Sequence, residues 1–349
     1  MIRYLTKRLA YGILVMWGVA TVIFFLFNIL PGDPARMLLG QRADISSVEA
    51  IRKDLGLDKP PFFQYLQYIN DLSPVSIHFD GDGEVPGFSI LSTSTWHLVI
   101  KKPYLRRSYQ SKRLVSSIIG EAFPKTLLLA VTAILLAMFI GLVLGVLAAL
   151  NHNKPLDRFL LVFSSLGMSI PSFFAAILMA WVFAYLLAEY TGLPMFGSLY
   201  SVDDVTGEQY INLRNLILPA ITLGIRPLAI VVSLTRSSML DVLSQDYIRT
   251  AYAKGLSRFQ VVIKHGLCNA LNPVITAITG WFASLMAGAV FVEYVFDWKG
   301  IGVVIVDALE KYDLPVIMGS VLFISIVLVL VNILVDVMYA VLDPRVRLE

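Results

Sequence analysis

The sequence predicts an all-α integral membrane protein with six transmembrane helices, and three observations support this fold class. First, 57% of the 349 residues are hydrophobic and only 15% are charged, whereas soluble domains carry about 25% charged residues. Second, six apolar stretches reach the roughly 20 residues that a helix needs to cross a bilayer: 9–30, 125–150, 159–187, 216–235, 271–292 and 317–341. Third, the short loops between these stretches alternate in their content of Lys and Arg. Each stretch must be helical, because lipid offers no hydrogen-bond partner to a free backbone amide.

The first element, residues 1–30, is predicted to be a transmembrane helix that stays attached to the protein. Basic residues precede its apolar run at Arg3, Lys7 and Arg8. The run is too long for the core of a signal peptide, and no cleavage site of small residues follows it. The helix is therefore expected to act as an anchor.

The distribution of basic residues predicts that both termini face the cytosol. The short loops 189–215 and 293–316 hold only Arg214, Lys299 and Lys311, whereas most other Lys and Arg residues of the short segments fall on the opposite side. Short loops rich in Lys and Arg stay in the cytoplasm. Residues 31–117 carry eleven basic residues, but a loop of this length crosses the membrane largely regardless of its charge.

Residues 31–117 are predicted to form an extracytoplasmic insert between the first two helices. We expect a short amphipathic helix near residues 46–56 and a hairpin in the segment 76–85, whose Asp-Gly pairs suit a tight turn. Asp80, Asp82 and Glu84 have the opening spacing of a calcium loop, but Val85 occupies the position where that loop needs glycine. A plain turn is the preferred interpretation. The basic run 101–113 is interpreted as a solvated linker, with contact to lipid phosphates or to an acidic protein as the alternative.

The remaining five helices are predicted to form one domain over residues 118–340, followed by a cytosolic tail at 341–349. Gly141 and Gly145 are spaced for close packing, either within the chain or against a partner helix. Between the fourth and fifth helices, within about 241–265, lies a polar and basic cytosolic segment, residues 246–260, which we call the elbow. Gly255 is placed to end one helix in a left-handed cap, and Ser257 with Gln260 forms a capping box that starts the next.

Several classes of function lack their sequence signals. No glycine-rich phosphate loop ending in Gly-Lys-Ser/Thr occurs, so the chain is not expected to hydrolyse ATP by that route. The four histidines have no partner at metal-ligand spacing, no serine nucleophile motif is present, and no disulfide can form within the chain because Cys268 is its only cysteine. The net charge of +3 is spread along the cytosolic edges, which indicates membrane orientation and not nucleic-acid binding. A protein that is not itself an enzyme is therefore expected.

Arg226 is the most unusual ionisable residue within a predicted span. It lies near the middle of the fourth helix and directly before Pro227, which frees the carbonyl of Leu223. Charged groups inside a membrane usually mark a path or a site. We hypothesise that Arg226 faces a water-filled path and attracts a carboxylate of the cargo. Pairing with an acid of a partner helix, purely for assembly, is the alternative.

Motifs along nearly the whole chain resemble the permease subunits of bacterial ATP-binding-cassette (ABC) importers of the dipeptide/oligopeptide/nickel group, most closely the dipeptide-permease B type. The motifs are Leu30-Pro-Gly-Asp-Pro-Ala, Leu55-Gly-Leu-Asp-Lys-Pro, Ser108-Tyr-Gln-Ser-Lys-Arg, Ser169-Ile-Pro-Ser-Phe, Ile217-Leu-Pro-Ala, Leu234-Thr-Arg-Ser-Ser-Met-Leu, Asp246-Tyr-Ile-Arg-Thr-Ala, Ala253-Lys-Gly-Leu and Leu342-Asp-Pro-Arg-Val. The resemblance implies a type I importer permease fold. The chain departs from the family pattern at Arg226, where an apolar residue is expected, and at Ser233, where arginine is common.

The resemblance also implies that the elbow is the segment through which an ATPase drives the permease. Arg249-Thr-Ala and Gly255 match the opening Glu-Ala-Ala and the glycine of the family's coupling loop. The coupling residues are then expected to be Tyr247, Arg249, Thr250, Ala251, Ala253, Lys254, Gly255 and Leu256. The candidate residues of the translocation path are Arg226, Ser169 and Ser172.

The resemblance implies an assembly in the bacterial cytoplasmic membrane. Its partners would be a second, homologous permease subunit, two cytosolic ABC ATPase subunits that bind ATP and Mg, an extracytoplasmic solute-binding protein and membrane lipid. No cofactor is expected on this chain. Peptides are the implied cargo, with nickel, glutathione or another small solute as alternatives. A secondary transporter driven by an ion gradient, or a membrane anchor without a path, are the alternatives from other classes.

Overall fold

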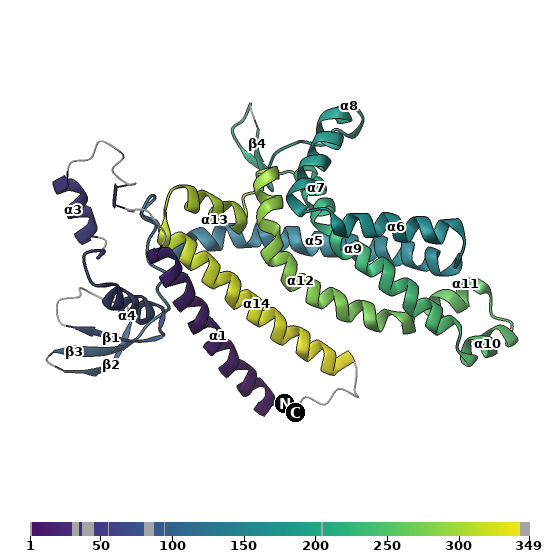
Figure 1. Cartoon of the computed structure of the whole chain (residues 1–349), viewed down its shortest axis with the longest axis horizontal. Helices are drawn as coiled ribbons and strands as arrows, with labels where there is room; N and C mark the ends of the chain where they lie inside the picture. The colour runs from purple at the N-terminus through teal and green to yellow at the C-terminus, as the bar shows by residue number, and fades with distance from the viewer. Residues whose placement is uncertain are drawn as a thin grey trace. The chain divides into compact units, whose positions relative to one another are not determined.

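The computed structural model describes residues 2–29, 35–36, 45–54, 56–79, 87–93, 95–203 and 205–342. The chain divides into two compact units, the first made of residues 1–4, 123–303 and 327–349 and the second of residues 5–122 and 304–326. The described part is mainly helical (Figure 1). Leu30 to Pro34, Leu55 and Asp343 to Val346, which belong to three of the sequence motifs, lie outside the described residues, as do Asp80, Asp82, Glu84 and Val85.

Five helical segments among the described residues are long and apolar enough to cross a membrane. They are Thr6–Phe27 within α1 (Ile2–Ile29), α5 (Val115–Leu150), α9 (Arg214–Leu243), Arg258–Met286, which includes the first part of α12 (Cys268–Phe296), and Leu314–Val337 within α14 (Leu314–Leu342). A sixth span exists only if the bent pair α6 (Pro155–Ser169) and α7 (Ser172–Met179), with its extension η1 (Ala180–Leu186), is counted as one.

The expectation of one uninterrupted helix over 159–187 was wrong. The chain bends by 110° between α6 and α7. Ile170 has extended backbone angles, φ −80° and ψ 128°, and α7 begins directly after Pro171. Proline disfavours the helical conformation of the residue before it and has no N–H to donate to the preceding turn. Apolar composition alone did not reveal this break.

The first unit is a bundle in which α9 packs against α12, α6 and α7. Its core includes Leu129, Leu218, Phe296 and Trp298, and the Trp298 indole donates a hydrogen bond to the Lys125 carbonyl over 3.0 Å. The pair of small residues in α5 packs within the chain. An ideal Cβ on Gly145 would lie 2.6 Å from the Thr235 Cβ of α9, and one on Gly141 would lie 2.6 Å from Val231 Cγ1.

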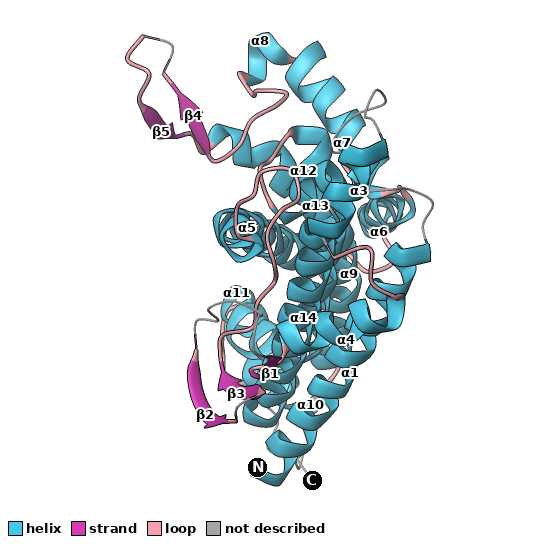
Figure 2. Cartoon of the chain, turned by 90° about the vertical axis from the view of Figure 1, so that its left-hand side faces the viewer, coloured by secondary structure: helices cyan, strands magenta, loops and turns pink. Residues whose placement is uncertain are grey.

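The connections of the first unit lie at its two ends. One end carries α8 (Ala188–Thr191) and a hairpin of β4 (Tyr200–Val202) and β5 (Gln209–Ile211), and the other carries α10 (Asp246–Ala253) and α11 (Arg258–Gln260) (Figures 1 and 2). The prediction places 189–215 and 246–260 on opposite sides of a membrane, and the fold of this unit is consistent with that arrangement.

The second unit contains the insert. Its helices are α3 (Ile45–Asp54), which confirms the helix expected near 46–56, and α4 (Pro61–Leu72); α13 (Ile301–Glu310) begins in the first unit and ends in the second. The three strands β1 (Val75–Phe79), β2 (Phe88–Ser92) and β3 (Trp96–Ile100) form an antiparallel sheet next to α4, in the order β1-β3-β2 (Figure 2).

Only the first half of the hairpin expected over 76–85 lies among the described residues, because residues 80–85 lie outside them. β1 pairs with β3, with Val75 opposite Ile100 and Phe79 opposite Trp96, so the next strand in the sequence is not its neighbour. The pairing of β1 with β3 was not part of the prediction, because no local sequence signal shows which distant strand β1 meets in the fold.

Hydrogen bonds, in addition to packing, hold the insert. The Asp313 carboxylate, 4% exposed, accepts hydrogen bonds from Ser108 Oγ over 2.5 Å and from the Tyr109 amide over 2.9 Å. The buried Tyr68 packs against Phe24 of α1 in the core of this unit, and burial raises the pKa of the Tyr68 hydroxyl to about 12.

Candidate functional site

The first half of the elbow ends in a complete C-terminal cap. Gly255 has φ +79°, in the left-handed region that favours glycine. The amide of Gly255 donates to the Tyr252 carbonyl over 2.9 Å, and the amide of Leu256 donates to the Ala251 carbonyl over 3.3 Å. These two bonds are the pair of a Schellman motif. The left-handed cap predicted from the sequence is confirmed.

The second half of the elbow begins with the predicted capping box. Ser257 Oγ accepts a hydrogen bond from the Gln260 amide, and Gln260 Oε1 accepts one from the Ser257 amide over 3.2 Å. From Arg258 the chain stays helical through α11, η2 (Val261–Leu267) and α12. The elbow is therefore directly continuous with a spanning helix.

A small apolar cluster fixes the elbow to the end of the bundle. Ile248, Ala251 and Val261 are 2%, 6% and 0% exposed and pack with Val242, Leu243 and Leu256. Only Ser244 and Gln245 separate α9 from α10. Since both neighbours of the elbow are spanning helices, a displacement of α10 must pull on the ends of α9 and α12.

The predicted coupling residues divide into two sets. Ala251 and Leu256 lie in the apolar cluster, and Gly255 forms the turn. The other five have exposed side chains on α10 and at its end: Tyr247, Arg249, Thr250, Ala253 and Lys254. Arg249 and Asp246 form an ion pair at 3.5 Å, but both side chains are more than 80% exposed, so the pair adds little stability.

Two exposed aromatic residues were absent from the predicted set. Tyr252 is 45% exposed on α10, and Phe259 is 75% exposed on α11. Tyrosine and arginine often supply most of the binding energy of protein interfaces. The signal that would have identified both residues is an aromatic side chain within a segment that is otherwise polar.

A buried ion pair joins the end of α9 to the start of α6. Asp157, 1% exposed, accepts hydrogen bonds from Arg236 Nε over 2.5 Å and Arg236 Nη2 over 2.7 Å, and a third from the Asn153 amide over 3.0 Å. A forked pair of this kind fixes both the distance and the orientation of the two helices. The pair therefore ties the end of α9 to the start of α6 and to the turn between α5 and α6.

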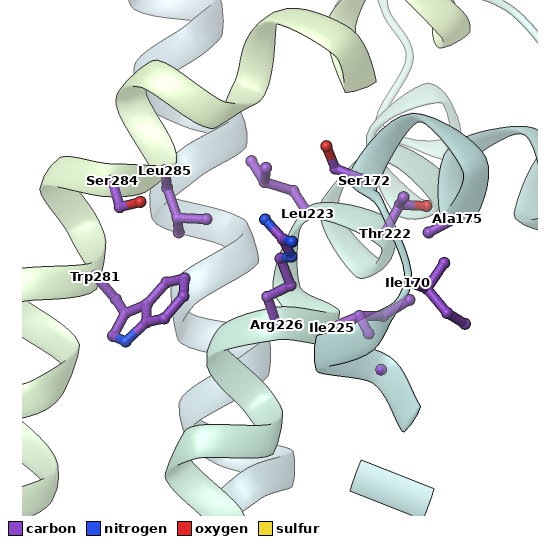
Figure 3. Close-up of a pocket in the computed structure, with 11 residues that line it drawn as sticks. Ile170, Ser172, Ala175, Thr222, Leu223, Ile225, Arg226, Trp281, Ser284 and Leu285 are labelled. Carbon is purple, nitrogen blue, oxygen red and sulfur yellow. The ribbon is translucent and has the colours of Figure 1, made fainter. Parts of the chain in front are cut away.

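A cavity of about 40 Å³ lies where α6 and α7 meet α9 and α12. The break at Ile170 opens it, and Arg226 enters it from α9, between Trp281 of α12 and Ser172 of α7 (Figure 3). Its other lining residues are Gly167, Ala175, Thr222, Leu223, Ile225, Ser284 and Leu285. The polar lining groups are an arginine, hydroxyls and an indole, all of which donate hydrogen bonds.

The structure brings together two of the three predicted path residues. Arg226 and Ser172 line the same cavity, whereas Ser169 lies outside it, and the Ser169 hydroxyl donates to the Ser165 carbonyl over 3.3 Å. Within the described part of the chain, Arg226 is exposed and forms no ion pair. No group of three or more His, Cys, Asp or Glu side chains that could hold a metal ion occurs among the described residues.

Comparison with known proteins identifies relatives over the whole chain. Residues 141–348 match the family described as binding-protein-dependent transport system inner membrane component, and residues 1–130 match the N-terminal region of such membrane components. The glutathione transport system permease proteins GsiC of Escherichia coli K12 and of Shigella dysenteriae serotype 1 are each 35% identical over 347 residues, which cover 99% of both chains. The MetNI methionine ABC transporter, in an inward-facing crystal structure, contains a chain with a similar fold. Its TM-score is 0.52 at 16% identity, and the match covers 65% of this chain and 97% of that one.

Proposed function

The chain belongs to the family of inner membrane components of binding-protein-dependent transport systems, and we propose that it forms part of the translocation path of an ATP-driven peptide importer. It is an ABC importer permease with several membrane-spanning helices. The observation that carries the proposal is the elbow. It is capped on both sides of Gly255, buried on one face and exposed on the other, and it is continuous with two spanning helices.

Energy for transport comes from outside this chain. The sequence has no phosphate-binding loop, so ATP and Mg are bound by two separate ATPase subunits. Their closing and opening pushes the exposed face of α10, which carries Tyr247, Arg249 and Lys254. Because the cap and the apolar cluster hold α10 rigidly, the push reaches α9 and α12 and alters the side to which the path is open.

The remaining partners complete the path and deliver the cargo. A second, homologous permease subunit faces this one across the path, and a solute-binding protein releases cargo at the extracytoplasmic side. Both termini and the elbow then lie in the cytosol, as the Lys and Arg content of the short loops predicts. The cavity at Arg226 is part of the path.

The cargo is proposed to be a peptide. The relatives at 35% identity are named glutathione permeases, and glutathione is itself a small peptide with free carboxylates. It is therefore the first alternative. A secondary transporter driven by an ion gradient is the alternative of another class.

Reconstitution of the complete complex in proteoliposomes tests this proposal. Uptake of the binding protein's ligand should require ATP on the side of the vesicle membrane where the ATPase subunits lie. It should not depend on a proton or sodium gradient. Uptake that follows an ion gradient in the absence of ATP would exclude the proposed mechanism.

A further inference from the structure

We infer that the cavity at Arg226 is a selective binding site that admits the carboxylate group of a cargo molecule and disfavours cations. The inference rests on the proposed path and adds to it the chemistry that the path accepts. It applies to peptides, to glutathione and to other carboxylates, and it argues against nickel ions as cargo.

The first argument is the charge of the cavity. Arg226 is the sole ionisable residue among those that line it, and no carboxylate of the described residues pairs with it. Arginine remains protonated in proteins, and an unpaired charge at mid-membrane depth is costly. A carboxylate from outside the chain removes that cost, whereas a cation adds repulsion.

The second argument is the set of hydrogen-bonding groups. Arg226 and Ser172 can donate to an anion from α9 and α7, and Ser284 can donate from α12, whereas Trp281 turns the carbon edge of its ring toward Arg226 (Figure 3). Thr222 is already engaged, because its hydroxyl donates to the Leu218 carbonyl over 2.7 Å. Groups from three helices thus face one small volume, and the arginine fork suits a planar carboxylate.

The third argument is size. A water molecule needs about 10–15 Å³ of cavity volume. The cavity of about 40 Å³ therefore accommodates a few waters or one carboxylate group. It does not hold a complete peptide. The cavity therefore fits the end group of a cargo molecule whose remainder lies in the wider path.

A charge-selective labelling experiment tests the inference without knowledge of the cargo. Cys268 is exposed and is first replaced by Ser, and Ser284→Cys then places one thiol in the cavity. The solubilised complex is treated with two methanethiosulfonate reagents of similar size, one carrying a sulfonate and the other a trimethylammonium group. The ratio of the two rates reports the local potential and cancels any general change in thiol reactivity.

The anionic reagent should react preferentially when Arg226 is present. A full charge a few ångströms away changes the local concentration of a charged reagent by about tenfold or more. Arg226→Gln should therefore lower the ratio at least about tenfold, and Arg226→Lys should preserve most of it. Arg214→Gln is the matched control, because it removes the same charge from the same helix, twelve residues or about 18 Å away, and it should leave the ratio unchanged.

Three outcomes would overturn the inference: a ratio insensitive to Arg226→Gln, a preference for the cationic reagent, or no reaction with either. A preference for the cation would indicate that an acid of the partner permease neutralises Arg226. The experiment does not depend on ATP, so a failure here is distinct from a failure of the proposed ATP-driven import.

Discussion

Replacing Gly255 by residues with a Cβ tests the cap of the elbow without changing any packing contact. Its φ of +79° lies in the left-handed region, and an ideal Cβ built on it meets no heavy atom within 4 Å. The effect of a side chain at this position is therefore confined to the backbone conformation. Among the elbow residues, this makes Gly255 the most direct probe of rigidity.

The magnitude follows from the cost of the left-handed conformation. An L-residue pays about 1–2 kcal/mol there, asparagine pays less, and a β-branched residue pays up to about 3 kcal/mol. Since about 1.4 kcal/mol is a factor of ten in an equilibrium, Gly255→Val disfavours the capped elbow by about 30-fold or more. Gly255→Ala should have an intermediate effect and Gly255→Asn the smallest.

The assay is ATP hydrolysis by the reconstituted complex, stimulated by the loaded binding protein, together with cargo uptake. ATP hydrolysis and cargo uptake should fall least in Gly255→Asn, more in Gly255→Ala and most in Gly255→Val. The amount of complex in the membrane should not change. Gly192→Val is the matched control. Gly192 has φ +59°, caps α8 at the opposite end of the unit and also leaves space for a Cβ, so it carries similar strain without touching the elbow. Normal coupling in Gly255→Val, or an equal loss in Gly192→Val, would refute the reasoning.

Two further predictions concern the packing of the helical bundle in the first unit. Asp157→Asn removes the charge opposite Arg236 in a buried pair, which should cost about 3 kcal/mol; the thermal unfolding midpoint of the purified complex measures this, and an unchanged midpoint would show that the pair is not structural. Gly145→Ala places a Cβ 2.6 Å from the Thr235 Cβ and should destabilise the complex by about 1–3 kcal/mol. Gly280→Ala is its control, because a Cβ at Gly280 meets nothing within 4 Å, and equal effects of the two changes would contradict the packing of α5 on α9.

The sequence predicted the features that depend on local chemistry. The capping box of Ser257 and Gln260, the left-handed Gly255 and the helix at 45–54 follow from short-range rules, and each is present. The apolar runs predicted the spans, because a helix that crosses lipid must be long and hydrophobic whatever its neighbours are.

The features that depend on tertiary contacts were predicted less well. The break at Pro171 changed one expected span into a bent pair, and the pairing of β1 with β3 was not anticipated. Ser169 and Ser172 are three residues apart in one motif, but the bend places only Ser172 in the cavity. Burial of Ala251 within the elbow also required the fold, because its small side chain suits internal packing and external docking equally well.

Cross-linking from the elbow to the ATPase subunits tests the central claim most directly. A single cysteine replaces Lys254, which is exposed next to Gly255, in a chain that lacks Cys268, and Asp203 in the opposite hairpin serves as the control position. The account predicts a cross-link between the cysteine at position 254 and an ATPase subunit, with a yield that changes on ATP binding, and none from position 203. Absence of a cross-link from every exposed position of residues 246–260 in an active complex would contradict it.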